Sequence, residues 1–147
     1  MKNVKEDLKK IEDIIKNLEL NSQSHLKVLL QDFLRNHLKK SKLENFIGDY
    51  PTFIEPVYLE ANTKIGDDVL LGPNVYIGKN CEIKDYVELS NTIILDNVKI
   101  GENIKLDSCI IGKNTTLNLA NITIDNCVLV GDVSNKEDLY KIMHKFE

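Results

Sequence analysis

Three histidines are the side chains best suited to acid–base chemistry in this chain of 147 residues, because imidazole titrates near neutral pH. They are His25, His37 and His144. A general base has to lie within hydrogen-bond reach of the proton that it removes. All three fall in segments that we predict to be helical, on exposed or half-buried faces. We therefore expect no catalytic role for them, and His144 is the least unsuitable because a terminal helix could reach a neighbouring subunit.

The three cysteines, Cys81, Cys109 and Cys127, could support redox or metal chemistry. Cys109 and Cys127 are 18 residues apart, and the repeat described below brings them to adjacent coils, near enough in principle to bridge. We favour a structural interpretation. Both take the place that Thr92 takes one coil earlier, which makes a ladder of small side chains, and Cys81 takes a repeat position otherwise held by valine. Buried thiols of this kind pack as small apolar groups.

Asparagine and aspartate recur along the middle of the chain and could serve as polar ligand-binding groups. Both residue types tolerate the left-handed backbone conformation that a tight corner demands, so we interpret the asparagines as corner residues. We expect the acidic side chains at the turns to be solvated: Asp67, Asp68, Asp85, Asp96 and Asp125. Five lysines are expected to lie on exposed helix faces: Lys39, Lys40, Lys136, Lys141 and Lys145. Nothing in their pattern supports a binding site for the phosphate of CoA.

A six-residue repeat must position these side chains. Its aliphatic anchors are Leu59, Ile65, Leu71, Ile77, Ile83 and Leu89. A small or branched residue follows each anchor by four positions, and the phase slips by one at Ile94 and again at Ile111. Because three units make one coil, we interpret the slips as shortened corners. The pattern predicts an all-β repeat fold, a parallel β-helix of about four coils over residues 53–131.

Each inward anchor would stack on the anchor one coil away and contribute roughly 1.5–3 kcal/mol. A single coil is not stable alone, so the ends of the stack need covering. We expect two helical elements to act as caps, one at each end of the chain. Residues 43–52, with Gly48 and Pro51, are expected to be a connection.

The N-terminal element, residues 1–46, is predicted to be a helical hairpin with a break at residues 21–24. Its first apolar stripe has heptad-like spacing: Val4, Leu8, Ile11, Ile15 and Leu18. Its second stripe comprises Leu26, Leu29, Leu30, Phe33, Leu34 and Leu38. The C-terminal element, residues 135–147, is predicted to be a short helix that faces the last coil with Leu139, Ile142, Met143 and Phe146.

Composition limits the classes of partner. The net charge is −4 without a dense basic patch, so we expect no nucleic acid partner. No stretch approaches the ~18–20 apolar residues of a membrane span. The first residues lack the apolar segment of a signal peptide, and the odd number of cysteines suits a reducing compartment. We therefore expect a cytoplasmic protein that has no membrane partner.

The repeat resembles that of hexapeptide-repeat proteins, whose fold is a left-handed parallel β-helix. Three runs are similar, more closely, to the C-terminal β-helix of sugar-1-phosphate nucleotidyltransferases of the glucose-1-phosphate thymidylyltransferase and mannose-1-phosphate guanylyltransferase types. They are Leu71-Gly72-Pro73-Asn74-Val75-Tyr76-Ile77-Gly78-Lys79-Asn80-Cys81, Asn91-Thr92-Ile93-Ile94-Leu95-Asp96-Asn97-Val98-Lys99-Ile100 and Asp107-Ser108-Cys109-Ile110-Ile111-Gly112-Lys113-Asn114. The resemblance covers residues 53–131.

That resemblance concerns only the tail of those enzymes. Their catalytic half opens with a Gly-rich pyrophosphate loop, and nothing in residues 1–51 resembles it, so we expect no nucleotidyl transfer by this chain alone. Many hexapeptide-repeat proteins are acyltransferases that use a coil histidine as base, and the zinc enzymes of this fold need three coil histidines. The coils here contain none. We accordingly assign no catalytic residue, no metal ligand and no cofactor.

The resemblance favours a stand-alone β-helix module for oligomerisation and for assembly or regulation of a partner enzyme. A homo-oligomer is implied, with a trimer favoured, and the partner could be a separately encoded nucleotidyltransferase. The stripe with Leu8, Ile11 and Ile15 offers a second contact surface. One alternative is an acyl- or acetyltransferase for a nucleotide sugar or amino sugar, with its active site between subunits. Another is a scaffold subunit of a larger complex.

Overall fold

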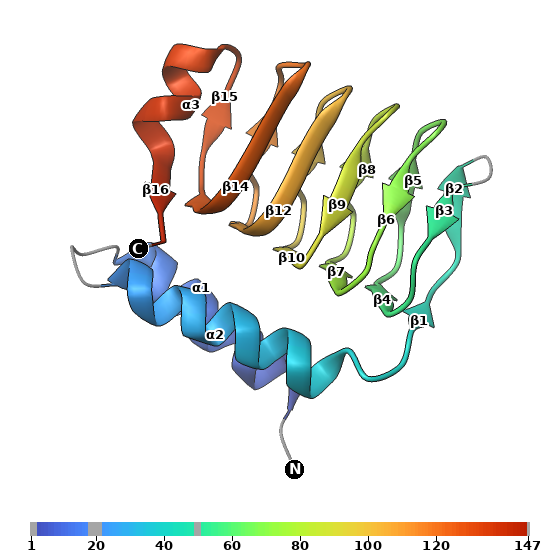
Figure 1. The fold of residues 1–147 in the computed structure, drawn as a ribbon, viewed down its shortest axis with the longest axis horizontal. Helices are drawn as coiled ribbons and strands as arrows, with labels where there is room; N and C mark the ends of the chain where they lie inside the picture. The colour runs from blue at the N-terminus through green and yellow to red at the C-terminus, as the bar shows by residue number, and fades with distance from the viewer. Residues whose placement is uncertain (1–2, 18–21, 49–50, 147) are drawn as a thin grey trace.

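The six-residue repeat folds into a parallel β-solenoid of about five turns (Figure 1). The computed structural model describes residues 3–17, 22–48 and 51–146. Each coil runs through three faces, and strands of neighbouring coils pair in parallel at a separation of 16 to 18 residues, as Val57 pairs with Val75 and Val75 with Thr92. Three six-residue units of the sequence therefore make one coil.

The strands fall into three columns. The first column, which we call the helix-side face, contains β1 (Lys42–Leu43), β4 (Val57–Leu59), β7 (Val75–Ile77), β10 (Thr92–Ile94) and the C-terminal halves of β12 (Ile104–Ile111) and β14 (Ile122–Leu129). The second face contains β2 (Phe46–Gly48), β5 (Thr63–Ile65), β8 (Glu82–Ile83), β11 (Lys99–Ile100), β13 (Thr116–Leu117) and β15 (Asp132–Val133). The third face contains β3 (Thr52–Phe53), β6 (Leu70–Leu71), β9 (Glu88–Ser90) and the N-terminal halves of β12 and β14.

The prediction of about four coils, with a connection over residues 43–52, was wrong by one coil. Strands β1, β2 and β3 already form a first coil on this segment, although its spacing does not follow the hexad. Lys42 pairs with Tyr58, and Phe46 pairs with Thr63. The repeat of aliphatic anchors is absent from residues 43–52, so hydrogen bonds to the next coil determine the register of β1, β2 and β3.

The corners confirm the interpretation of the asparagines. The non-glycine residues with positive φ are Asn62, Asp68, Asn74, Asn80, Tyr86, Asn91, Asn97, Asn103, Ser108, Asn114, Asn121 and Asn126. They stack in columns, and amides one coil apart bond to each other, as Asn103 Nδ2 donates to Asn121 Oδ1 at 2.8 Å. The predicted anchors meanwhile fill a continuous aliphatic core, in which Leu59, Leu71 and Ile77 have no exposed surface.

Helices α1 (Val4–Lys16) and α2 (Ser22–His37) do not cap the end of the stack as expected. They lie along its helix-side face (Figure 1). The reason is a row of apolar side chains that point outward from this face, including Tyr76, Ile93, Ile110 and Val128, which the helices bury. The first apolar stripe therefore packs inside the molecule, since Ile11 is only 1% exposed. Leu18 and the start of the predicted break, residue 21, lie outside the described residues.

The C-terminal segment closes the last coil, but it is only partly helical. Helix α3 (Lys136–Ile142) begins where Asn135 Oδ1 accepts from the backbone N–H of Asp138 at 2.8 Å. Strand β16 (Met143–Lys145) follows and pairs antiparallel with β14. Of the residues predicted to face the last coil, Leu139, Ile142 and Met143 pack on its core. Phe146 instead joins the cluster beneath α1 and α2. None of the helices described is long and apolar enough to cross a membrane.

Candidate functional site

The histidines occupy three separate environments, and none belongs to a coil. His25 is exposed on α2. His37, at the end of α2, has a side chain only 5% exposed, with Nε2 2.7 Å from Asp7 Oδ2 of α1 and its ring centroid 4.8 Å from that of Phe33. His144 lies on β16, not on a helix as predicted, and is opposite Val128. The clearest function of the three belongs to His37, which ties α1 to α2.

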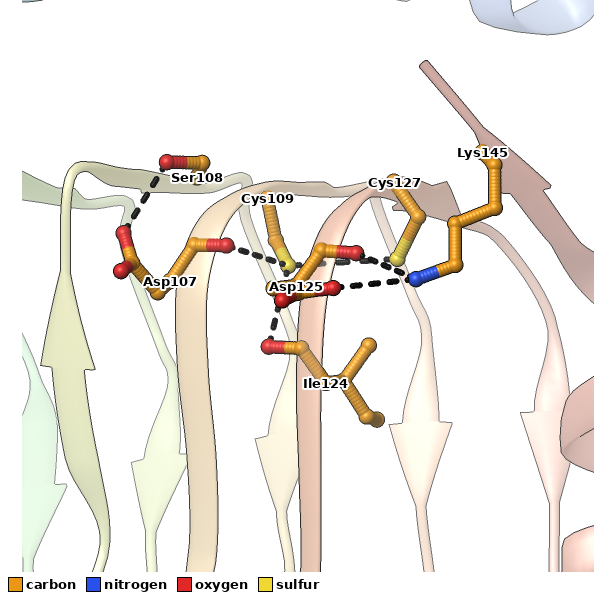
Figure 2. Close-up of polar contacts among 7 residues, drawn as sticks. All are labelled: Asp107, Ser108, Cys109, Ile124, Asp125, Cys127 and Lys145. Carbon is orange, nitrogen blue, oxygen red and sulfur yellow. Dashed lines mark hydrogen bonds and ion pairs between the residues drawn. The ribbon is translucent and has the colours of Figure 1, made fainter. Parts of the chain in front are cut away.

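The cysteines are free and buried, which fits their interpretation as core side chains. Cys109 of β12 and Cys127 of β14 lie side by side on neighbouring coils, with 3.9 Å between their sulfur atoms (Figure 2). The hydrogen bond that it shares with Cys127, together with burial, raises the pKa of Cys109 well above that of a free thiol. Burial raises the pKa of Cys81 to about 11. Because Cys81 and Cys109 stay protonated in a closed core, they are poor nucleophiles and poor metal ligands.

A polar pair closes the coil edge beside these sulfur atoms. Lys145 Nζ of β16 donates to the backbone carbonyl of Asp125 at 2.8 Å and to its carboxylate at 3.1 Å (Figure 2). Asp107 and Ser108 bond to each other one coil away. The cluster therefore anchors β16 to β14. In residues 3–17, 22–48 and 51–146, no group of three or more His, Cys, Asp or Glu side chains could hold a metal ion.

Besides Asp125, two of the acidic residues expected to be solvated are structural instead. Asp85 Oδ1 accepts from the backbone N–H of Asp67, and Asp96 Oδ1 accepts from that of Lys79, both at 2.8 Å. Each carboxylate reaches over the coil edge to the coil before it. A Cβ added at Gly78 would lie 2.4 Å from Asp96 Oδ1, so the small residue after the anchor makes room for this contact.

A groove of about 470 Å³ lies between α2 and one corner of the solenoid. We call it the α2 groove. Its helix wall carries Lys27, Gln31 and Arg35, and its floor is made by apolar side chains of α2 with Phe146. Its solenoid wall consists of four stacked left-handed corner residues: Asn74, Asn91, Ser108 and Asn126. The asparagines were predicted as corner residues, but the groove was not predicted, because the helices were expected at the end of the stack.

The first coil leaves the N-terminal end of the solenoid uncovered. In the part of the chain that the structure describes, no strand pairs with the outer edge of β1, β2 or β3. Large apolar side chains are exposed there: Leu43 by 44%, Ile47 by 69% and Ile54 by 44%. Phe46 and Phe53 make an edge-to-face ring pair at 5.7 Å and only partly cover the core. We call this surface the open end.

Sequence reasoning also missed the open end, because residues 43–52 were taken as a connection. A usable signal was present. Four large apolar residues, Leu43, Phe46, Ile47 and Phe53, occur within or beside this short stretch, and surface connections are usually polar with turn residues. Such a density indicates a segment that packs against something.

Comparison with known proteins agrees with this architecture. The family model described as GMPPB C-terminal domain matches residues 53–143, which is more than half of the chain and includes the coils from β3 onward together with α3. A search of curated proteins gave no match. The match confirms the left-handed parallel β-helix of the sugar-nucleotidyltransferase tail that the runs of the repeat predicted. Helices α1 and α2, and the first two strands of the open end, precede the matched region. The chain therefore belongs to the GMPPB C-terminal domain family.

Proposed function

We propose that this chain is an assembly module that binds, through its open end, the catalytic domain of a sugar-1-phosphate nucleotidyltransferase carried by another chain. The family match supports the kind of partner, because the matched region is the tail domain of such an enzyme. In residues 1–51 no stretch resembles the Gly-rich pyrophosphate loop that the chemistry needs. A β-helix domain of this family suits assembly or regulation of a catalytic domain.

The observation that carries the proposal is the exposure of the open end. Leu43 belongs to the column of inward anchors, where it pairs in register with Leu59. Leu59 is fully buried, whereas Leu43 is 44% exposed because no coil of the described residues lies beyond it. Free strand edges beside apolar side chains are favourable places for another polypeptide to pair. Contiguous exposed apolar surface of this kind marks interaction sites.

The opposite end is closed, which gives the module a direction. Helix α3 packs Leu139 onto the core, and β16 pairs with the outer edge of β14. The apolar Tyr140 is exposed by 63% on α3, far along the chain from the open end. It offers a matched position for a control substitution.

Self-association of the module stays part of the proposal, with the trimer as the favoured state. The helices cover the helix-side face, so a trimer that forms through the sides would use the second or third face. Several outward positions on these faces are charged, for example Lys64 and Glu82, and Lys105 pairs with Glu88 of the neighbouring coil at 3.1 Å. An oligomer that forms through such charged faces is expected to weaken as the salt concentration rises.

A retention experiment tests the partner. The immobilised chain is incubated with an extract of its own cells, and retained proteins are identified by mass spectrometry while sugar-1-phosphate nucleotidyltransferase activity is assayed in the eluate. We expect a nucleotidyltransferase to be retained, and a Leu43→Asp, Ile47→Asp double variant to retain at least tenfold less. A Tyr140→Asp variant is expected to retain it fully. Retention of no nucleotidyltransferase, or equal loss in both variants, would contradict the proposal.

A further inference from the structure

The α2 groove combines cations and amides in two parallel rows. Lys27, Gln31 and Arg35 follow one another at intervals of four residues along α2. Because an α-helix rises 1.5 Å per residue, this row is about 12 Å long. The facing row is a single corner of four successive coils, which lie about 4.8 Å apart and span about 14 Å. The two rows therefore run side by side for the length of a small, extended molecule.

The helix wall is cationic and has free capacity. Lys27 has no ion-pair or hydrogen-bond partner among the described residues, and Arg35 contacts only Asp32 of its own helix, with its side chain 74% exposed. No acidic side chain lines the groove. An anionic group placed there meets two cations, of which Arg35 is already paired with Asp32 and Lys27 is unpaired among the described residues. Phosphate is the anion that such Lys and Arg side chains bind most readily.

The solenoid wall is polar, neutral and pre-organised. Asn74 Nδ2 donates to Asn91 Oδ1 at 3.0 Å, and Asn91 Nδ2 donates to Asp107 Oδ1 at 3.1 Å, so these amides are held in fixed orientations. Ser108 is oriented by the same carboxylate at 2.9 Å. Each Asn amide keeps donor and acceptor capacity beyond these bonds. The side chain of Asn126, at the end of the row, has no partner in the described part of the chain. Alternating donors and acceptors on a rigid wall suit a series of hydroxyl groups.

The floor of the groove is apolar, with Leu30, Leu34 and Phe146 beneath the two polar walls. A site with an apolar floor and a few converging polar groups is the usual form of a small-molecule site. The C–H face of a sugar ring fits this floor. We infer that the α2 groove binds a phosphorylated sugar, whose phosphate meets Lys27 or Arg35 and whose hydroxyl groups meet the corner row. This inference does not depend on the open end.

A second groove, of about 320 Å³, provides the internal comparison. It lies between α1 and another corner, where lysines face Glu12, Asp13, Glu60 and Asp96. Glu12, which lines this groove, also pairs with Lys113 at 3.6 Å. Its positive and negative charges offset each other, whereas no acidic side chain lines the α2 groove and Lys27 is unpaired there among the described residues. Lys9 and Lys16, which line the second groove, are therefore suitable positions for control substitutions.

Titration calorimetry with glucose 1-phosphate as the probe tests the inference, with glucose and inorganic phosphate as comparison ligands. We expect glucose 1-phosphate to bind the wild-type chain more tightly than either comparison ligand. A Lys27→Ala, Arg35→Ala variant is expected to bind at least tenfold more weakly, and Asn126→Ala several-fold more weakly. A Lys9→Ala, Lys16→Ala variant, which removes the same charge, is expected to bind as wild type does. Melting temperatures within a few degrees of wild type confirm that the variants are folded.

Three results would overturn the inference. The first is the absence of heat and of any thermal shift with glucose 1-phosphate at millimolar concentration. The second is inorganic phosphate that binds as tightly as glucose 1-phosphate, because the groove would then recognise only the anion. The third is an equal loss of binding in the two double variants, because the effect would then come from total charge and not from the α2 groove.

Discussion

Leu43 and Leu59 are in-register partners on neighbouring coils of one core column, yet Leu43 is 44% exposed and Leu59 is fully buried. The difference arises because the column continues through Ile77 on one side of Leu59 and stops at Leu43 on the other. A solenoid coil is stabilised mainly by its neighbours. The open end therefore leaves apolar surface exposed, whereas α3 and β16 cover the core at the other end.

The outward apolar row beneath the helices should contribute as much stability as an ordinary core position. We predict that Ile110→Ala lowers the free energy of unfolding by about 2–4 kcal/mol, because its side chain is fully buried against α1 and α2. Thr123→Ala, at an exposed strand position, should change it by less than about 0.5 kcal/mol. Urea denaturation followed by circular dichroism measures both. Equal, small effects would mean that the helices do not pack on this face.

His37 should hold α1 on α2. Because its buried ring bonds to Asp7 at 2.7 Å and packs on Phe33, we predict that His37→Ala costs about 1–3 kcal/mol. Hydrogen exchange of the α1 amides should accelerate in this variant while the coils stay protected. His25→Ala, at an exposed site on the same helix, serves as the control and should leave exchange unchanged. Unaltered protection of the α1 amides in the His37 variant would show that His37 does not hold α1 on α2.

Gly78 should resist enlargement. A Cβ at this position would lie 2.4 Å from Asp96 Oδ1 and 2.9 Å from the Asp96 backbone nitrogen, and backbone cannot move aside cheaply. We predict that Gly78→Ala destabilises the chain by about 1–3 kcal/mol, whereas Lys79→Ala, at the exposed next residue, stays near wild type. Thermal unfolding compares the two. A Gly78→Ala variant as stable as wild type would show that the coil edge is looser than described.

Cys81 should make stability fall at high pH. Burial raises its pKa from 9.0 to about 11, so the unfolded chain loses this proton first as the pH rises. The linkage sign follows: no stability is lost below pH 9, and stability declines between pH 9 and about 11. Denaturation at pH 8, 9.5 and 10.5 should show this slope, and a Cys81→Ala variant should show a shallower one. Parallel slopes in both proteins would place the effect elsewhere.

The coils could be predicted from sequence because their cause is local and repeated. Each buried anchor, such as Leu59 or Ile77, sits six residues from the next, and each corner needs a residue that tolerates positive φ, such as Asn74. Both requirements place a characteristic residue type at fixed intervals in the sequence.

The first coil and the position of the helices depend on contacts between distant residues, and these contacts produce no periodic pattern in the sequence. Pairing of Lys42 with Tyr58 follows from the next coil, not from the residues of β1. The sequence shows the consecutive apolar residues Ile93 and Ile94, but only the folded coil shows that Ile93 points outward to the helices. The α2 groove could be recognised only in the structure, because it depends on where α2 packs and on which side chains of the coil point outward.

Site-specific photo-crosslinking at the open end tests the central claim most directly. A photoreactive benzoylphenylalanine replaces Ile47, which is 69% exposed, or in the control Tyr140, which is 63% exposed at the closed end. Cells that express either variant are irradiated, and the crosslinked products are identified by mass spectrometry. We predict a crosslink from position 47 to the catalytic domain of a sugar-1-phosphate nucleotidyltransferase and none from position 140. A crosslink to that enzyme from position 140 alone, or from neither position, would contradict the account.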